Sequence, residues 1–298
     1  MPAVPEQAHV LERLSGLGKE QRSIRAVVLT STRAKPDAPV DVLSDYDVIL
    51  FVTEADAFSR DDAWQSAYGR PLVRWGDQKQ LHGLTIYFRG VVYDNGVKID
   101  YSIWPEALLE LIAAHPRLPD GLDVGYRVLL DKDGRTAAWP QPTHQAHIPA
   151  KPTNAEYDAL VEEFWWSTTY VAKSLWRREV VHAKFTLDND AKFVALRRFL
   201  EWRIEIDHDW SLKPGAYGRG LERLLPADIW TELASTYVGT DIEDNWKALF
   251  CTTALFRRVA TEVGVALGYA YPRELDAAMT AHLERVRKLP VQGRAASG

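Results

Sequence analysis

Short apolar runs separated by turn residues dominate the first half of the chain. Ile24–Thr30 and Val48–Thr53 are almost entirely apolar, which is typical of strands that are covered on both faces. Leu84–Arg89 and Val97–Ile103 flank Asn95-Gly96, a pair that favours a type I′ hairpin turn because both central positions of that turn need positive φ. These runs predict a β-sheet that contains at least one hairpin.

A further strand is predicted at Tyr126–Leu130, and two helices are predicted between the strands of this half. They cover Ala55–Tyr68 and Pro105–His115, and the second opens with proline at the first helical position, where its missing N–H does no harm. Residues 1–23 are polar and contain two prolines and two glycines, so we expect no signal peptide there.

The pattern changes near residue 150. Residues 140–152 (PQPTHQAHIPAKP) hold four prolines, and each proline lacks an N–H and disfavours helix in the residue before it. After this segment the chain reads as helical. Thr153 or Asn154 can cap a long helix that runs to about His182, and three later helix starts are indicated at Pro226, Asp241 and Pro272. The last residues, 290–298, are expected to be frayed.

The fold class is therefore α+β. We expect a mixed-sheet domain at residues 1–140, a proline-rich linker at residues 141–152 and an all-helical domain at residues 153–298.

Composition narrows the classes of protein that the chain can belong to. Hydrophobic residues make up 46% of the 298 residues, enough for a sizeable core, and the single cysteine excludes an internal disulfide and fits the cytoplasm. No apolar run is long enough for a membrane helix. The net charge is −5 and no basic stripe is visible, so we expect no nucleic-acid partner; an acidic balance suits a cationic ligand.

The candidate chemistry lies in three aspartates near strand starts. Asp45 and Asp47 are two residues apart just before an apolar run, so their side chains point the same way in extended chain. Asp100 lies on the polar face of the second hairpin strand. An Asp-x-Asp pair alone is more often a turn or solvated surface. Three converging carboxylates, however, repel one another unless a cation lies between them, and two Mg²⁺ ions holding a triphosphate suit such a set.

Upstream, the first strand runs into a hydroxyl-rich turn that contains Ser31, Thr32 and Arg33. Hydroxyl and backbone N–H groups at a strand end can bind phosphates, and a guanidinium can neutralise them. An ordinary polar turn is the alternative, and these residues alone do not exclude it.

These motifs resemble the aminoglycoside 6-adenylyltransferases, also called streptomycin adenylyltransferases. The hydroxyl turn, Asp45-Tyr46-Asp47 and Lys98-Ile99-Asp100-Tyr101 carry the resemblance in the first half. It continues in 128–133 (VLLDKD), through the end of the linker at 151–153 (KPT), and into the second half in 163–173 (EFWWSTTYVAK), 235–237, 246–250, 254–257 and 268–272. The family usually has Gly-Ser-Arg where this chain has Ser31-Thr32-Arg33, so a Cβ stands where the backbone would approach a phosphate.

The resemblance implies a nucleotidyltransferase fold followed by a helical substrate domain, and Mg²⁺-dependent transfer of AMP from ATP to an aminoglycoside hydroxyl with release of pyrophosphate. Asp45, Asp47 and Asp100 match the family's metal-binding acidic residues. Our hypothesis is that Ser31, Thr32 and Arg33 bind the phosphates and that Lys173 and Lys184 reach them from the helical domain. A surface lysine is the alternative for Lys173.

The cationic acceptor is expected to bind to the helical domain, which is rich in acidic and aromatic residues. Between residues 188 and 244 there are twelve acidic residues against seven basic ones. Carboxylates can bind ammonium or guanidinium groups, and aromatic faces can stack on them. The candidate acceptor-binding residues are Asp188, Glu201, Glu205, Trp165 and Trp202. Asp188 and Glu205 are also candidates for the general base.

Rival interpretations remain open at this point. The protein could act on another protein or a different small metabolite, or it could be a catalytically weak relative that binds nucleotide. A monomer or a weak homodimer is expected.

Overall fold

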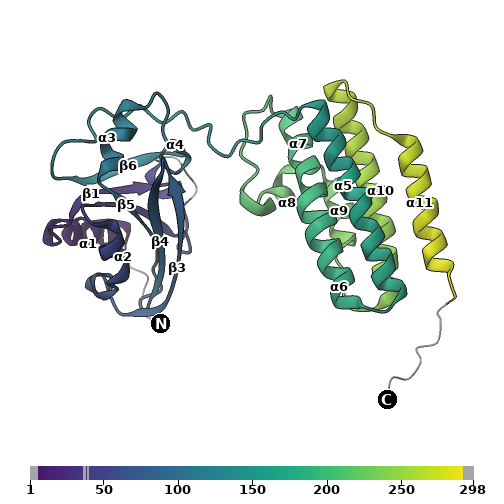
Figure 1. The fold of residues 1–298 in the computed structure, drawn as a ribbon, viewed down its shortest axis with the longest axis horizontal. Helices are drawn as coiled ribbons and strands as arrows, with labels where there is room; N and C mark the ends of the chain where they lie inside the picture. Colours follow the sequence, from purple (N-terminus) through teal and green to yellow (C-terminus); the bar gives the residue numbers. More distant parts are fainter. Residues whose placement is uncertain (1–5, 36–37, 39, 291–298) are drawn as a thin grey trace, which may run out of the picture. The chain divides into compact units, whose positions relative to one another are not determined.

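The computed structural model describes residues 6–35, 38 and 40–290, and the chain divides into two compact units, Met1–Ala146 and His147–Gly298 (Figure 1). The tail that was expected to be frayed lies almost wholly outside the described residues. The first unit is a mixed sheet with helices and the second is helical, so the α+β class is confirmed. In the described ranges, no helix is long and apolar enough to cross a membrane.

Six strands form one mixed sheet in the order β3-β4-β5-β2-β1-β6. β2 and β5 run parallel, and the other neighbouring pairs are antiparallel. The predicted strands are all present, but β3 was not foreseen, because it is an edge strand whose residues 72–80 are all exposed and form no buried apolar run. The strands are β1 (Ile24–Thr30), β2 (Tyr46–Val52), β3 (Pro71–Leu81), β4 (Leu84–Tyr93), β5 (Lys98–Pro105) and β6 (Tyr126–Asp131).

Alternate residues of the central strands supply two separate cores, one on each face of the sheet. Leu50 points to the core that contains Val10 and Leu14 of α1 (Gln7–Glu20), and α2 (Ala55–Arg60) covers the same face. Phe51 points to the opposite core, where α3 (Ala107–Ala114) and α4 (Asp120–Asp123) pack, as Figure 1 shows. The sheet is therefore covered on both faces near the carboxyl ends of β2 and β5.

The two helices predicted in this unit are shorter than expected. The first ends at Arg60, and a 3₁₀ turn, η2 (Ala63–Ala67), follows, because the Asp61 carboxylate accepts the backbone N–H of Ala63 and breaks the helix. The second begins at Ala107, since Pro105 still belongs to β5, where it lies opposite Val52.

The predicted hairpin between β4 and β5 is confirmed, but its predicted turn type is wrong. Only Gly96 has positive φ, at 82°, and Asn95 does not. The Tyr93 N–H donates to Val97 and the Gly96 N–H donates to Tyr93, which makes a three-residue loop with glycine in the left-handed position. Positive φ at two successive residues occurs instead at His82-Gly83, between β3 and β4, as a type I′ turn requires.

The helical unit opens with α5 (Asn154–Trp176), whose N-terminus has a capping box made by Thr153 and Glu156. The helix ends at Trp176 instead of about His182, because Arg178 adopts a φ of 60°. The predicted starts at Pro226, Asp241 and Pro272 are confirmed. The other helices are α6 (Val180–Phe185), the π-helical η3 (Thr186–Leu196), α7 (Arg197–Asp207), α8 (Leu221–Leu224), α9 (Ala227–Ser235), α10 (Ile242–Leu267) and α11 (Arg273–Lys288).

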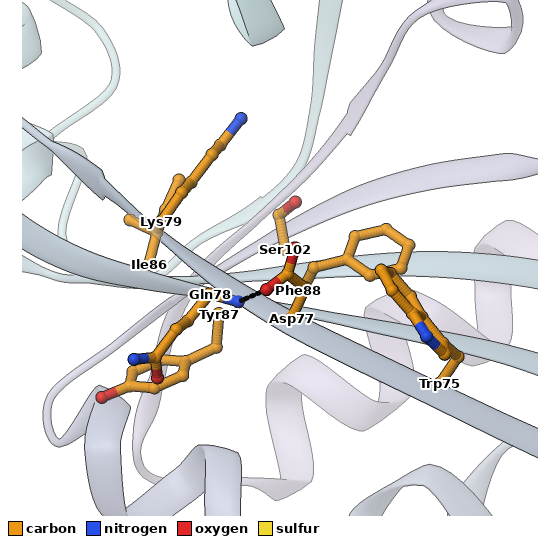
Figure 2. A pocket seen from close by; sticks show the side chains of 8 residues that line it. All are labelled: Trp75, Asp77, Gln78, Lys79, Ile86, Tyr87, Phe88 and Ser102. Carbon is orange, nitrogen blue, oxygen red and sulfur yellow. Dashed lines mark hydrogen bonds between the residues drawn. The ribbon is translucent and has the colours of Figure 1, made fainter. Parts of the chain in front are cut away.

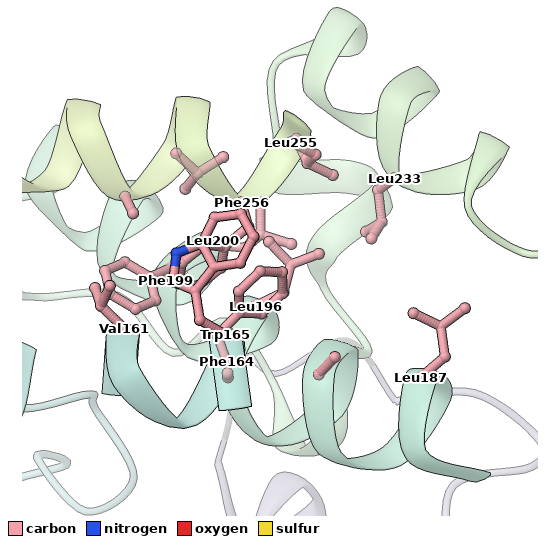
Figure 3. Close-up of a cluster of buried hydrophobic side chains, with 14 of the residues drawn as sticks. Val161, Phe164, Trp165, Leu187, Leu196, Phe199, Leu200, Leu233, Leu255 and Phe256 are labelled. Carbon is pink, nitrogen blue, oxygen red and sulfur yellow. The ribbon is translucent and has the colours of Figure 1, made fainter. Parts of the chain in front are cut away.

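Aromatic side chains form the centre of this unit's core. Phe164 of α5 stacks on Phe256 of α10 with ring centroids 3.6 Å apart and an interplanar angle of 5°. Phe199 of α7 meets the Phe256 ring edge-on at 5.0 Å, and Leu196 and Leu200 pack beside them (Figure 3). Rings of this size bury much apolar area, so they tie three helices together.

The first part of the expected linker is anchored to the sheet unit. The Asp123 carboxylate accepts the backbone N–H groups of Thr143, Gln145 and Ala146 and the Thr143 hydroxyl. Burial alone would raise the pKa of Asp123, but these donors hold it below its ordinary value. Residues 141–146 are therefore part of the first unit.

Two glycines in α1 provide a matched test of its packing. A Cβ at Gly18 would lie 2.6 Å from side-chain carbons of Leu130 and Val27, whereas Gly16 has nothing within 4 Å. We expect Gly18→Ala to lower the free energy of unfolding by about 1–3 kcal/mol through overpacking. Gly16→Ala should raise it by about 0.5–1 kcal/mol, since alanine restricts the unfolded chain. Urea unfolding measures both, and equal effects would contradict this packing.

Candidate active site

Three aspartates meet where the parallel strands β2 and β5 begin. Asp47 and Asp100 are direct partners in the β2–β5 register. Asp45 lies two residues before Asp47, next to the start of β2, so it points to the same side of the sheet. The carboxylates predicted from separate parts of the sequence are thus brought together at one edge of one face.

The proximity of these carboxylates changes their electrostatics. Burial, and next the negative charge of Asp100, raise the pKa of Asp47 to about 6, while a hydrogen bond from Ser31 and the charge of Lys98 oppose this rise. The Asp100 Oδ1 atom is buried and has no hydrogen-bond partner among the described residues. The site therefore holds more negative charge and more acceptor capacity than the protein neutralises.

The Lys98 ammonium lies between two of the carboxylates. Its Nζ is 2.6 Å from Asp45 Oδ2 and 2.8 Å from Asp100 Oδ2. Partial burial opposes the charged form, yet hydrogen bonds to the two carboxylates raise the pKa of Lys98 overall. The Lys98 ammonium is therefore a cation of the protein itself that lies beside the carboxylate oxygens.

A divalent cation fits the donor set. In the part of the chain that the structure describes, no three His, Cys, Asp or Glu side chains form a ready metal cluster. The three aspartates nevertheless offer only oxygen donors, which Mg²⁺ prefers, and one of those oxygens is buried and unpartnered. Asp45, Asp47 and Asp100 are the residues that could hold such an ion.

Ser31 holds a backbone conformation that normally requires glycine. Its φ of 63° and ψ of −146° lie outside the left-handed region that side chains tolerate. Its N–H donates to the Gly125 carbonyl at 3.1 Å, and its hydroxyl hydrogen-bonds Asp47. The serine thus adds a contact to the carboxylate site at the cost of backbone strain. Thr32, which follows, is exposed at the start of η1 (Thr32–Ala34).

Arg33 has a different role from the phosphate binding that we expected. All three of its guanidinium nitrogens donate within the protein, to the carbonyls of Asp41, Ser44 and Asp45 and to the Gln7 side chain. Its guanidinium also lies over the Tyr46 ring, 4.0 Å from the centroid. Arg33 is buried and engaged in these contacts, so it positions the loop that carries Asp45.

The lysines and one acid predicted in the helical unit lie on different helices. Lys173 is exposed on α5 with its ammonium 4.4 Å from the centroid of the Tyr170 ring. The Lys184 ammonium donates to the Val238 carbonyl and pairs with Asp188 at 3.2 Å. Asp188 also pairs at 2.7 Å with Lys192, which is buried. Asp188 is thus already balanced by two lysines.

The two glutamates predicted for substrate binding are enclosed in the helical unit. Glu201 pairs with Arg197 at 2.6 Å. Glu205 is fully buried, and this burial raises its pKa, although one of its oxygens accepts the Leu212 N–H. Glu205 has no exposed surface for a ligand or for a role as general base in this structure.

The predicted stacking role of Trp165 and Trp202 is wrong for this structure. The two residues are only 1% and 3% exposed, and they belong to the aromatic core of the helical unit. A buried ring has no free face for a substrate. The number of tryptophans in the sequence does not show which of their rings are buried in the core and which are exposed at the surface.

Lys98 and Gly90 are site residues that the sequence reasoning did not assign. Lys98 could have been found, because it lies two residues before Asp100 and so shares the polar face of β5. Gly90 carries no such signal, and only the strand register shows that it lies opposite Asp100.

The chain is similar to known proteins over most of its length. Residues 5–286 match the family model described as streptomycin adenylyltransferase. The chain is 30% identical over 271 residues to an aminoglycoside 6-adenylyltransferase of Campylobacter jejuni, covering 89% of this chain and 91% of that protein. It is 31% identical over 269 residues to the protein of the same name from Bacillus subtilis, covering 88% and 91%. A crystal structure of a Bacillus subtilis aminoglycoside 6-adenyltransferase aligns with a TM-score of 0.47 at 25% identity, covering 97% of this chain and all of that one.

Replacing Lys98 tests whether its ammonium stands in for a cation. We expect Lys98→Met to lower stability by about 1 kcal/mol, because the carboxylates then face one another without a counter-charge. MgCl₂ should raise the melting temperature of this variant more than that of the original protein. Lys247→Met, which removes the partner of Asp244 in the helical unit, is the control and should show no such rescue. Equal responses to MgCl₂ would contradict the assignment.

Two substitutions at Ser31 separate strain from hydrogen bonding. Ser31→Gly should be more stable than Ser31→Ala by about 1–3 kcal/mol, because only glycine adopts this φ and ψ freely. Both variants lose the hydroxyl contact with Asp47, so their difference isolates the backbone. Thermal and urea unfolding measure it, and an alanine variant as stable as the glycine variant would show that position 31 is unstrained.

Proposed function

This chain belongs to the streptomycin adenylyltransferase family and is a nucleotidyltransferase, and we propose that it transfers AMP from ATP to a hydroxyl group of an aminoglycoside, releasing pyrophosphate. The relatives named aminoglycoside 6-adenylyltransferase, which match about nine-tenths of the chain, support the acceptor class. The proposed fold of the sheet unit is that of the nucleotidyltransferases.

The observation that carries the proposal is the carboxylate group at the start of β2 and β5. Asp47 and Asp100 are paired across parallel strands, and an Asp100 oxygen is buried without a partner. Such an arrangement is unfavourable unless positive charge is added, and phosphoryl transfer is a reaction that uses added positive charge. A surface turn would not need a carboxylate with a buried, unpartnered oxygen.

We propose that Asp45, Asp47 and Asp100 hold Mg²⁺, two ions being the number that a triphosphate substrate suits. Bound there, Mg²⁺ would offset charge on the phosphates and lower the pKa of the acceptor hydroxyl. The chain's own contribution is positional: the strand register sets the spacing of Asp47 and Asp100, and Arg33 fixes the loop that carries Asp45.

In the proposed reaction, the acceptor oxygen forms a bond to the α-phosphorus while the bond from this phosphorus to the bridging oxygen of the β-phosphate breaks. Pyrophosphate leaves with the electron pair of that bond, and the hydroxyl proton passes to a base. Ser31 and Thr32 remain the proposed contacts for the β- and γ-phosphates, because they lie at the end of β1 beside Asp47. Phosphate binding by Lys173 and Lys184, and acceptor binding by Asp188 and Glu201, stay predictions.

The experiment is mass spectrometry of a panel of aminoglycosides, streptomycin included, after incubation with the protein, ATP and MgCl₂. We expect a mass gain of one AMP on at least one member and loss of this adduct in EDTA. Asp47→Asn and Asp100→Asn should each lower turnover by roughly a hundredfold or more, since each removes several kcal/mol of charge stabilisation.

Asp94→Asn is the matched control, because Asp94 lies in the loop between β4 and β5 and, among the described residues, its carboxylate pairs with the exposed Arg70 alone. Near-normal turnover of the Asp47 or Asp100 variant would refute the carboxylate assignment. ATP binding without an adduct on any panel member would point to another small metabolite or a protein as acceptor. Tight ATP binding with no release of pyrophosphate, even when a cell extract supplies metabolite and protein acceptors, would favour a catalytically weak relative.

A further inference from the structure

A cavity of about 240 Å³ lies on strands β3, β4 and β5, near the carboxylate group. Trp75, Asp77 and Lys79 of β3, Phe88 of β4 and Ser102 of β5 line it, and Figure 2 shows them around one stretch of the hairpin. The cavity is smaller than a whole drug-sized site and has room for one ring of a larger ligand.

The cavity lies on the same face of the sheet as the carboxylates. Trp75 is opposite Gly90, Gly90 is opposite Asp100, and Asp100 is opposite Asp47. These four residues form one row across four neighbouring strands, with strands about 4.8 Å apart. Partners in a row share a face of the sheet. Trp75 is two strands away from Asp100, which is roughly 10 Å, on the side away from Asp47.

Gly90 allows the Phe88 ring and the Asp100 carboxylate to pack closely over its backbone. A Cβ at this position would lie 3.1 Å from Asp100 Oδ1 and 3.1 Å from Phe88 Cε1. The Phe88 ring, which lines the cavity, and the unpartnered Asp100 oxygen are therefore neighbours above Gly90. The cavity therefore lies next to the proposed reaction centre, with the Phe88 ring between the two.

The direction of the proposed reaction determines what the cavity can bind. In an in-line displacement the acceptor approaches the phosphorus from the side opposite the leaving group. The proposed pyrophosphate contacts, Ser31 and Thr32, follow β1, which borders Asp47 on the side away from Asp100. With the pyrophosphate on that side, the acceptor would approach over β5, β4 and β3, where the cavity lies.

The lining suits a ring that carries hydroxyl groups and a positive charge. Trp75 is 63% exposed, unusual for so large an apolar side chain, and its ring lies 5.5 Å from that of Phe88 at 59°. In the described part of the chain, the Asp77 carboxylate takes part in no ion pair; it accepts only the adjacent Gln78 N–H. Ser102 adds a hydroxyl group to the lining. Lys79, which is opposite Ile86, adds a positive charge at the end of the cavity away from Trp75 (Figure 2).

We propose that this cavity binds one ring of the acceptor, an ammonium- or guanidinium-bearing polyhydroxylated ring that lies against Trp75 and pairs with Asp77. The inference rests on the proposed function and places acceptor binding on the sheet unit. Trp75 and Asp77 are thus specificity-determining residues for the acceptor.

The test measures KM for the modified aminoglycoside and for ATP separately, with streptomycin as the first acceptor. We expect Trp75→Ala to raise the acceptor KM by roughly threefold to thirtyfold, the range of a cation–π contact, and to leave the ATP KM unchanged. Asp77→Asn should raise the acceptor KM similarly, and its effect should shrink as NaCl is added. Leu72→Ala is the control, because Leu72 is 61% exposed on the same strand and does not line the cavity.

The outcomes separate the possible occupants. A raised KM for ATP in Trp75→Ala with an unchanged acceptor KM would overturn the inference and assign the cavity to the adenine ring. Unchanged values for both substrates, with melting temperatures equal to that of the original protein, would also overturn it while leaving the proposed function intact. If the original protein modifies no aminoglycoside, the proposed function fails and this inference fails with it.

Discussion

Repulsion between Asp47 and Asp100 is the constraint around which the sheet unit is organised. The parallel register of β2 and β5 places the two residues opposite each other, so the backbone of the sheet holds their side chains at neighbouring positions on one face. The consequence is visible in the raised pKa of Asp47, caused first by burial and then by Asp100. Lys98, and the hydroxyl of Ser31, partly relieve it.

Much of the surrounding structure serves to keep these groups in place. The Arg33 guanidinium hydrogen-bonds the loop before β2, and it lies over the Tyr46 ring. Ser31 has an unfavourable backbone conformation, and its hydroxyl hydrogen-bonds Asp47. Buried charge and backbone strain of this kind tend to gather at functional sites, where both are held by the rigid elements around them.

The sheet face that carries Asp47 and Asp100 has different roles at its two ends. Near the carboxyl ends of β2 and β5, Phe51 and Trp104 pack under α3 in a closed core. Near the starts of these strands the face carries the carboxylates, and towards β3 it opens into the cavity beside Trp75. One alternating strand pattern thus supplies both a core that stabilises the fold and a polar surface that is suited to chemistry. In the helical unit, by contrast, several acidic groups are already paired, as Asp188 and Glu201 show.

The sequence by itself determined the local elements and the chemical class of the candidate site. Apolar runs located β1 and β2, caps located the starts of α5 and α10, and strand alternation placed Asp100 on a polar face. These features depend on neighbours within a few residues. Register, burial and partner choice depend on residues far apart in the chain. Only the tertiary structure therefore decided that Asp47 faces Asp100 and that the Arg33 guanidinium hydrogen-bonds the loop before β2. For the same reason, only the tertiary structure showed that Trp165 lies in the core and that an exposed edge strand places Trp75 beside the site.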